Sequence, residues 1–167
     1  MSDLRINISK LPEGSHQRSL LTAPGEIGLD SRFTKEVNVE AELEKTSRQL
    51  YVRVKFSATG KFTCDRCLDE YERDISSAFG IMYVADGEQG AGGDDEVQII
   101  SPDTNIVDIG EDVRQFAILA LPQKNLCSED CKGLCPTCGK NLNRGKCECQ
   151  NDVGDPRWSA LKKIVKN

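Results

Sequence analysis

Histidine and aromatic side chains are scarce in this chain of 167 residues. It has one histidine, one tryptophan and an aromatic fraction of 5%. A Ser-His-Asp catalytic set would have to use the single histidine, and catalytic zinc normally takes His or carboxylate ligands and keeps one position for water. Outside the cysteines, no residue qualifies as a general base or a nucleophile. We therefore expect a protein that is not an enzyme.

Long apolar runs are also absent from the sequence. No stretch approaches the roughly 18 apolar residues that indicate a membrane-spanning helix. The first residues, MSDLRINISK, show neither the apolar core nor the cleavage pattern of a secretory signal. We therefore expect a cytoplasmic protein, in which cysteine pairs more often bind metal or carry out redox chemistry than form lasting disulfides.

Positive charge is in short supply as well. The chain has 22 Lys and Arg against 27 Asp and Glu, which gives a net charge of −5. This balance argues against a generic nucleic-acid-binding protein, because such proteins are basic overall. It leaves room for a local basic patch, or for a basic partner such as a ribosomal protein.

Alternating apolar residues predict several strands, which fall in residues 4–9, 33–45, 49–62 and 71–84. The period of two in the last three segments is typical of an antiparallel meander with one face exposed to water. Residues 97–100 and 105–109 could add short strands. Residues 11–32 are interrupted by Pro and Gly, and we expect them to form a long loop with short extended pieces.

Two later segments have the apolar period of a helix. Residues 113–121 and residues 156–165 each place their apolar side chains on one helical face. We therefore predict an α+β fold, with an antiparallel sheet that could close into a barrel, two helices and a C-terminal Cys-rich zinc module. The predicted division is a β-rich domain with one helix over residues 1–126, and a zinc-binding module with the last helix over residues 127–167.

Cysteine is the residue that the chain has in abundance, with eight in all. Cys135 and Cys138 form a Cys-Pro-x-Cys-Gly knuckle, a tight turn that aims two thiolates at one point. Gly139 relieves the backbone where it curls under the sulfurs. Zinc takes four such ligands in a tetrahedron, and Cys147 and Cys149 are the nearest residues that complete the set.

The remaining cysteines form two pairs, Cys64 with Cys67 and Cys127 with Cys131. The first pair ends one predicted strand and precedes the next, so we expect it at the tip of a β-hairpin. Because each pair lacks a mate, the economical arrangement is a second four-cysteine site, which brings the expected zinc ions to two. In the alternative arrangement, Cys127 and Cys131 share a site with Cys135 and Cys138. The hairpin pair, Cys64 and Cys67, then shares a site with Cys147 and Cys149.

Other interpretations of the cysteines are less favoured. A disulfide framework is typical of exported proteins, and no export signal is visible. Iron–sulfur clusters also take four thiolates, but the Cys-Pro-x-Cys-Gly knuckle favours zinc or a single iron. A thioredoxin-like redox pair would precede a helix, whereas Cys64 and Cys67 lie between predicted strands. Two closed, structural zinc sites are therefore expected.

Basic side chains gather in the C-terminal part of this acidic chain. They are Lys132, Lys140, Arg144, Lys146, Arg157, Lys162, Lys163 and Lys166. In one interpretation they offset the negative charge of thiolate-rich zinc sites. In the other they form a contact surface for RNA or the ribosome, since phosphate contacts come mainly from Lys and Arg.

Three segments resemble the bacterial YceD family, the large ribosomal RNA subunit accumulation proteins. They are TGKFTCDRCLDEYERDI, DIGEDVRQFAILALPQKNLCSEDCKGLCPTCGKNLNRGKCEC and DPRWSALKKI, within about residues 40 to 166. The resemblance implies a cytoplasmic, non-catalytic factor that supports accumulation of large-subunit ribosomal RNA and ribosome assembly. It implies ribosomal RNA or a basic protein of the large subunit as partner, with no membrane and no small-molecule substrate.

A hypothesis from another class is a redox-responsive zinc protein. Oxidation would eject the metal from such a protein and expose a binding surface. Thiolates at the exposed tips of hairpins motivate this hypothesis, because exposure makes a thiolate reactive.

Overall fold

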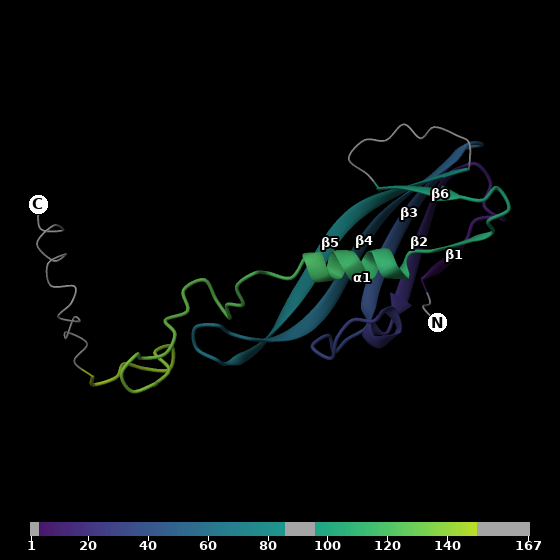
Figure 1. Ribbon diagram of the computed structural model, residues 1–167. Helices are drawn as coiled ribbons and strands as arrows, with labels where there is room; N and C mark the ends of the chain where they lie inside the picture. The colour runs from purple at the N-terminus through teal and green to yellow at the C-terminus, as the bar shows by residue number, and fades with distance from the viewer. Residues whose placement is uncertain (1–3, 86–95, 150–167) are drawn as a thin grey trace, which may run out of the picture. The chain divides into compact units, whose positions relative to one another are not determined.

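A five-stranded sheet carries most of the core of the computed structural model, which describes residues 4–85 and 96–149 (Figure 1). Its strands lie in the order β2 (Gly14–Thr22), β3 (Val37–Lys45), β4 (Gln49–Thr63), β5 (Glu70–Ala85) and β6 (Glu96–Ile100). β3 pairs antiparallel with both β2 and β4, whereas β6 runs parallel to β5.

Sequence alternation decides which face of this sheet is buried. The register places Val39 opposite Phe56 and Leu43 opposite Val52, and all four side chains are at most 3% exposed. Ala41 and Val54 form a third buried pair between them, and the alternate residues, such as Glu40 and Lys55, are mostly charged and point to the other face. Cross-strand apolar pairs of this kind stabilise a sheet by about 0.2–1 kcal/mol each.

A helix and a small second sheet complete the core. The helix α1 (Gly110–Leu119) lies against the larger sheet (Figure 1), and its Phe116 ring stacks on Phe79 of β5 with 4.2 Å between centroids. β1 (Arg5–Asn7) and β7 (Ile106–Asp108) pair antiparallel, and a short 3₁₀ helix, η1 (Pro24–Ile27), contacts α1. Val113 and Ala117 are the fully buried residues on the inner face of α1.

The chain forms two compact units. The described parts of residues 1–62 and 71–123 make up the first unit, which holds both sheets and α1. The described parts of residues 63–70 and 124–167 make up the second unit, which holds all eight cysteines. The tip of the β4–β5 hairpin therefore belongs with the C-terminal segment.

Several sequence predictions need correction at the level of the fold. The sheet is open, with β2 and β6 as its edges, so the predicted barrel is wrong. It is also mixed, because β6 pairs with β5 in parallel. Nine residues of the predicted loop, in which only short extended pieces were expected, form the strand β2. There the half-buried His16 donates a hydrogen bond from its Nε2 atom to the carbonyl oxygen of Pro12 (2.9 Å).

The predicted strands before β6 and the predicted helix before Pro122 are present. The strands expected at residues 97–100 and 105–109 are present as β6 and β7. The second predicted helix, at residues 156–165, lies outside the described residues. Within the described ranges, no helix has the length and apolar character needed to cross a lipid bilayer.

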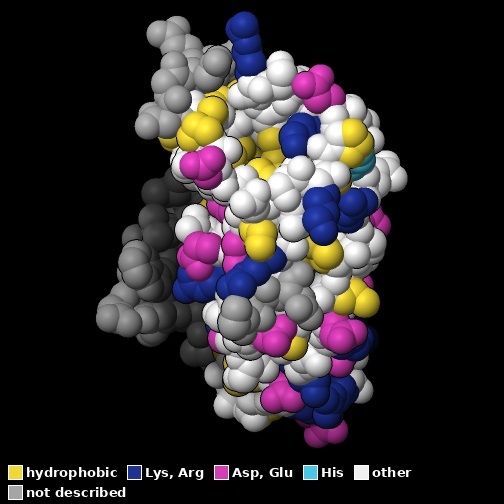
Figure 2. All heavy atoms as spheres, turned by 90° about the vertical axis from the view of Figure 1, so that its right-hand side faces the viewer, with side chains coloured by type: hydrophobic (Ala, Val, Ile, Leu, Met, Phe, Trp, Pro, Cys, Tyr) yellow, Lys and Arg dark blue, Asp and Glu magenta, His cyan; other side chains and the backbone are white. Residues whose placement is uncertain are grey.

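Charges of both signs are interspersed on the surface. On the face drawn in Figure 2, Lys and Arg side chains alternate with Asp and Glu side chains, and neither sign forms a continuous patch. Exposed ion pairs such as Lys35 with Glu72 (3.2 Å) and Arg53 with Glu42 (3.6 Å) follow the same pattern. A face of mixed charge attracts a long phosphate backbone less strongly than a uniformly basic face does.

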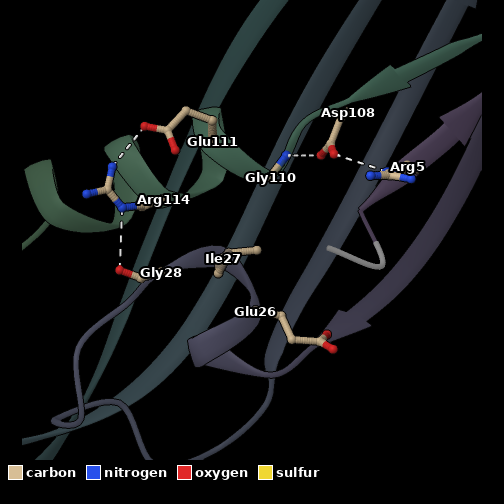
Figure 3. A pocket seen from close by; sticks show the side chains of 8 residues that line it. All are labelled: Arg5, Glu26, Ile27, Gly28, Asp108, Gly110, Glu111 and Arg114. Atoms are coloured by element: carbon tan, nitrogen blue, oxygen red, sulfur yellow. Dashed lines mark hydrogen bonds and ion pairs between the residues drawn. The ribbon is translucent and has the colours of Figure 1, made fainter. Parts of the chain in front are cut away.

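A cavity of about 540 Å³ lies beside the first turn of α1 (Figure 3). Arg114 donates from its guanidinium to Glu111 (2.8 Å) and to the carbonyl oxygen of Gly28 (3.4 Å). Arg5 is paired with Asp108 at 3.4 Å. Two ion pairs thus join four of the charged side chains in its wall, and Glu26 accepts a hydrogen bond from the Oγ1 atom of Thr22 (3.4 Å), so we regard the cavity as a structural junction.

Candidate metal centres

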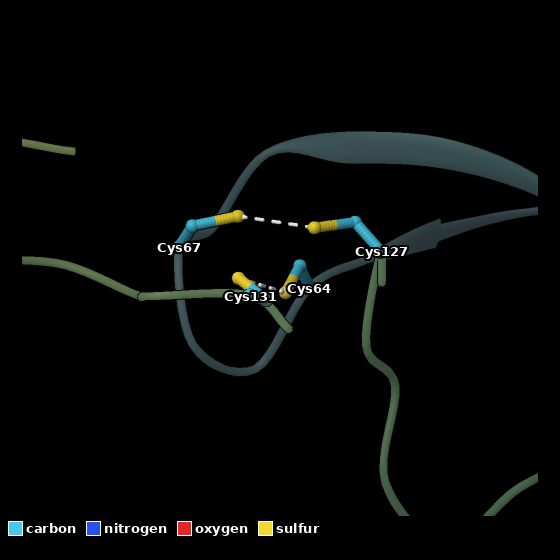
Figure 4. Close-up of side chains that lie close together, drawn as sticks. All are labelled: Cys64, Cys67, Cys127 and Cys131. Atoms are coloured by element: carbon cyan, nitrogen blue, oxygen red, sulfur yellow. Dashed lines mark hydrogen bonds between the residues drawn. The ribbon is translucent and has the colours of Figure 1, made fainter. Parts of the chain in front are cut away.

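The first group of cysteines, here called the hairpin cluster, consists of Cys64, Cys67, Cys127 and Cys131 (Figure 4). The first two lie in the turn between β4 and β5, and the last two follow α1 in the chain. The Sγ atom of Cys64 is 3.7 Å from that of Cys131, and the Sγ atom of Cys67 is 3.6 Å from that of Cys127. All four sulfurs lie within 4.8 Å of one another.

These distances discriminate between kinds of cysteine chemistry. A disulfide requires sulfurs at about 2.05 Å, so the hairpin cluster holds free thiols. A tetrahedral zinc ion with Zn–S bonds of about 2.3 Å places its sulfurs about 3.8 Å apart. The observed distances of 3.6 and 3.7 Å are close to that value. The donor set and its spacing therefore fit zinc.

The second group, here called the C-terminal cluster, consists of Cys135, Cys138, Cys147 and Cys149. Its sulfurs also lie within 4.8 Å of one another. This grouping is the one that the economical arrangement predicts, and the alternative pairing of the cysteines does not occur. In the C-terminal cluster only Cys135 is buried, whereas three of the four cysteines in the hairpin cluster are buried. The C-terminal cluster therefore lies nearer to solvent.

The knuckle of the C-terminal cluster is a tight turn closed by two backbone hydrogen bonds. The N–H of Gly139 donates to the carbonyl oxygen of Cys135 (2.9 Å), and the N–H of Cys135 donates to that of Lys140 (2.9 Å). Gly139 has a φ of 72°, in the left-handed region that glycine enters without strain. Gly139 thus allows the backbone to curl under the sulfurs without strain, as the sequence predicts.

The knuckle of the hairpin cluster makes the same turn with a different residue. The N–H of Leu68 donates to the carbonyl oxygen of Cys64 (2.9 Å), and the N–H of Cys64 donates to that of Asp69 (2.9 Å). Leu68 occupies the position of Gly139, with a φ of 59°. For a residue with a Cβ atom, this left-handed backbone conformation is less favourable than the right-handed one by about 1–2 kcal/mol, so the turn is strained at Leu68.

The loop between the ligand pairs of the C-terminal cluster reaches the hairpin cluster. The Nδ2 group of Asn143 donates to the Sγ atom of Cys131 at 3.2 Å. The Oδ1 atom of Asn143 accepts from the N–H of Lys132 at 2.8 Å, which fixes the orientation of the amide. Partners of this kind orient metal ligands and adjust their basicity. Asn143 is therefore a positioning residue for Cys131.

Further contacts hold the same loop against the hairpin tip. Asn141 donates to Asp69 at 2.7 Å, and Arg144 donates to the other oxygen of Asp69 at 2.9 Å. The N–H of Leu142 donates to the carbonyl oxygen of Gly133 at 2.9 Å. The two clusters thus share one hydrogen-bonded framework within the second unit, which the cysteine spacing alone does not predict.

The environment of the hairpin cluster separates the pKa values of its thiols. Burial acts to raise the pKa of the Cys64 thiol, but backbone N–H groups that donate to its sulfur lower this pKa to about 6. For Cys67, the N–H of Asp69 acts to lower the pKa, but burial and the neighbouring sulfurs raise it to about 12. The Cys64 thiol therefore ionises readily, whereas the Cys67 thiol keeps its proton unless a cation replaces it.

The C-terminal cluster shows the same division. Backbone N–H groups of Cys138 and Thr137 lower the pKa of Cys135 to about 6. The sulfur of Cys138 and burial raise the pKa of Cys149 to about 12. Four adjacent thiols that cannot all ionise by themselves are a suitable receptor for a divalent cation, which binds in exchange for their protons.

The predicted contact residues for RNA or a protein partner are only partly described. Lys132, Lys140, Arg144 and Lys146 are exposed. Two of them are already engaged, because Arg144 pairs with Asp69 and the Nζ group of Lys140 donates to the carbonyl oxygen of Lys146 (2.9 Å). The other four are Arg157, Lys162, Lys163 and Lys166, which lie outside the described residues.

Asn143 and Asp69 are site residues that the sequence analysis missed. Asp69 follows Cys67 by two residues and Asn143 precedes Cys147 by four, and neither spacing distinguishes them from other polar residues. The available signal was the Asn-Leu-Asn run between the two ligand pairs of the C-terminal cluster, since Asn side chains bind sulfur and backbone groups in turns.

A family model described as large ribosomal RNA subunit accumulation protein YceD matches residues 52–165 of the chain. This region includes all eight cysteines. No solved structure matches the chain.

Curated relatives fall into two groups. The chain is 33% identical over 60 residues to the chloroplastic large ribosomal RNA subunit accumulation protein YCED homolog 1 of Arabidopsis thaliana, which covers 36% of the chain and 19% of that protein. It is 34% identical over 80 residues to the chloroplastic homolog 1 of Zea mays, and this match covers 47% of the chain and 27% of that protein. The chain thus spans well under a third of these plant proteins. The match to YlbN of Bacillus subtilis, 28% identical over 145 residues, covers 84% of the chain and 80% of that protein.

Proposed function

Because the chain belongs to the YceD family of large ribosomal RNA subunit accumulation proteins, we propose that it supports the accumulation of large-subunit ribosomal RNA. In this proposal it acts in the cytoplasm as a non-catalytic, zinc-binding factor in ribosome assembly. The names of the plant relatives support the ribosomal part of the proposal. The single observation that supports the zinc part is the pair of four-cysteine clusters, with sulfurs 3.6 and 3.7 Å apart in the hairpin cluster.

The proposed role of the metal is structural. Zinc bound by four thiolates keeps no open position for a substrate or an activated water. In the hairpin cluster, Cys64 and Cys67 would hold the hairpin tip, and Cys127 and Cys131 would hold the segment that follows α1. Zinc would thus fix the second unit in one arrangement, because structural zinc sites contribute their binding free energy to folding.

The proposed partners are ribosomal RNA or a basic protein of the large subunit. Exposed Lys132, Lys140, Arg144 and Lys146 are the described candidates for phosphate contacts, together with the basic residues of the C-terminal segment. The interspersed charges on the face drawn in Figure 2 favour a small, specific contact over bulk electrostatic binding.

A deletion strain tests the ribosomal role. We expect large-subunit ribosomal RNA to fall relative to small-subunit RNA, and the wild-type chain to restore the ratio. The double variant Cys64→Ser with Cys135→Ser should not restore it, since both clusters lose a ligand, whereas Ser128→Ala should. The wild-type protein should also co-sediment with large-subunit precursors in a density gradient. Normal RNA ratios in the deletion strain would contradict the proposal.

The exposure of two ligand cysteines favours a second candidate function, a redox-responsive zinc protein. Cys127 and Cys138 are exposed, so an oxidant can reach one thiol in each cluster. Treatment of the zinc-loaded protein with equimolar peroxide separates the candidates. A structural protein should keep its zinc, whereas a redox sensor should release zinc into a colorimetric chelator and bind it again after reduction.

A further inference from the structure

A groove between β1 and β2 in the first unit is lined by three cations and by no acidic residue. It has a volume of about 480 Å³, and its lining residues are Arg5, Ile6, Asn7, Lys10, Leu11, Arg18 and Leu20. The first three belong to β1, the last two belong to β2, and the remaining two lie in the connection between these strands. The groove is therefore a local basic site in a chain whose net charge is −5.

The buried residues of this basic groove are apolar, whereas its cations are exposed. Ile6 and Leu11 are 4% and 7% exposed, and the half-buried Leu20 packs against the core. Lys10 and Arg18 are exposed. The core thus supports the groove from below, and the charged groups remain within reach of a molecule in solution.

Little of the positive charge is neutralised by the protein itself. Within the described residues, Lys10 forms no ion pair, and Arg18 donates only to the carbonyl oxygen of Gln17 (3.0 Å). Arg5 donates its Nε–H group to Asp108 at 3.4 Å (Figure 3), so this carboxylate offsets part of its charge. Two full positive charges and part of a third are therefore left to attract an anion.

Lys45 holds the turn that carries Lys10. Its Nζ group donates to the carbonyl oxygens of Ile8 (2.7 Å) and Leu11 (2.9 Å). These two residues on either side of the turn are buried, which leaves Lys10 to point away from the core. Because the backbone of the turn is fixed before a ligand arrives, binding orders little more than the cationic side chains.

The composition of the basic groove discriminates among ligands. Lys and Arg supply most protein contacts to phosphate, and the same cations repel a basic protein. The groove has no aromatic side chain on which a base could stack, so it suits the backbone of a nucleic acid better than its bases. A small-molecule site would enclose its ligand among apolar and aromatic side chains, whereas the cations of this groove are exposed.

We propose that the basic groove binds the phosphate backbone of large-subunit ribosomal RNA through Lys10 and Arg18, with Arg5 as a third contact. The choice of RNA rests on the proposed function, whereas the preference for an anion rests on the charges of the groove itself. Two or three phosphate contacts fix one point of the RNA on the first unit. This is a small contact, as the interspersed charges on the face drawn in Figure 2 require.

The test measures binding of the full chain to protein-free large-subunit ribosomal RNA at salt concentrations from about 50 to 200 mM. Each phosphate contact contributes roughly 0.7–0.9 to the slope of log K against log salt concentration. Lys10→Gln combined with Arg18→Gln should therefore bind at least about tenfold more weakly at the lowest salt, with a slope smaller by about two. Lys10→Arg combined with Arg18→Lys keeps both charges and should bind about as tightly as the wild type.

The matched control is Lys55→Gln combined with Arg73→Gln. It removes the same charge from two exposed residues of the first unit that do not line the groove, and it should leave affinity and slope nearly unchanged. Equal weakening by the two glutamine pairs would overturn the proposal, by showing that the RNA responds only to net charge. If the double variant in the groove does not fold, Lys10→Gln alone provides the test, with an expected change in slope of about one.

Unchanged RNA binding by the groove variants would contradict the proposal. So would a wild-type chain that ignores the RNA and instead binds an acidic protein from RNA-free large subunits through Lys10 and Arg18. Failure of the wild-type chain to bind the RNA would overturn this inference alone, because the deletion strain tests the proposed function separately.

Discussion

The hairpin cluster and the C-terminal cluster use the same ligands in different topological settings. The C-terminal cluster takes its cysteines from one short segment, residues 135–149, whereas the hairpin cluster joins residues 64–67 to residues 127–131. The C-terminal cluster therefore organises a local turn, whereas the hairpin cluster connects two parts of the chain between which β5, β6, β7 and α1 lie in the sequence. The difference predicts that loss of each cluster has different consequences.

The largest effect is expected when the hairpin cluster loses a ligand. Cys64→Ser should bind one zinc ion in place of two, and residues 124–134 should become sensitive to limited proteolysis, because their attachment to the hairpin tip depends on the metal. Zinc analysis and mass spectrometry of the proteolytic fragments measure both effects. Ser128→Ala, a change in the same segment at an exposed residue outside the ligand set, should retain two zinc ions. A Cys64→Ser protein with two zinc ions would contradict the assignment.

A smaller effect is expected when the C-terminal cluster loses a ligand. Cys147→Ser should also bind one zinc ion, but residues 124–134 should stay protected, since the hairpin cluster is complete. The remaining zinc should be held more weakly than in the wild type, because the loop that carries Asn143 loses its anchor at the C-terminal cluster. Competition with a chelator of known affinity measures the change. Equal proteolysis of Cys147→Ser and Cys64→Ser would remove the distinction between the clusters.

A still smaller effect is expected at the contact that links the two clusters. Asn143→Ala should retain two zinc ions, with the hairpin cluster binding its zinc about tenfold more weakly, because the hydrogen bond to the Sγ atom of Cys131 is lost. The chelator competition described for Cys147→Ser applies here too. Lys146→Ala serves as the control, since its exposed side chain is outside the shared framework. Unchanged affinity in Asn143→Ala would show that the clusters are independent.

The smallest effect is expected at the ion pair between Arg144 and Asp69. Arg144 is 74% exposed and Asp69 is 37% exposed, and pairs of this kind contribute less than about 1 kcal/mol. Arg144→Ala should therefore lower the free energy of unfolding by less than this amount and leave zinc binding unchanged. Chemical denaturation of the zinc-loaded protein measures the difference. A loss of zinc from this variant would show that the loop depends on the ion pair.

The parts of the fold that follow from sequence are those governed by local periodicity. The alternation of Val39, Ala41 and Leu43 predicts β3 because one face of the sheet is buried. In the segment that forms β2, the sequence predicted only short extended pieces and not a continuous strand. Its mostly exposed residues alternate weakly, so that pairing with β3 decides its conformation. The parallel pairing of β6 with β5 could not be predicted, because local periodicity contains no information on strand direction.

The candidate site divides in the same way. Cysteine spacing predicts both knuckles, and the need for four ligands predicts how the pairs combine. The roles of Leu68 and Asn143 could not be predicted, because a positive φ at a leucine and a side-chain bond to a sulfur depend on the folded backbone. Sequence thus indicates the ligands, and the structure adds the residues that position them.

The most direct test of the two-centre account is a count of metal ions per chain. The full-length protein, purified without added zinc, should contain two zinc ions per chain by elemental analysis. Its eight cysteines should react with a thiol reagent only after the metal is chelated. One zinc ion per chain, iron in place of zinc, or thiols that react freely before chelation would contradict the assignment of two four-cysteine zinc centres.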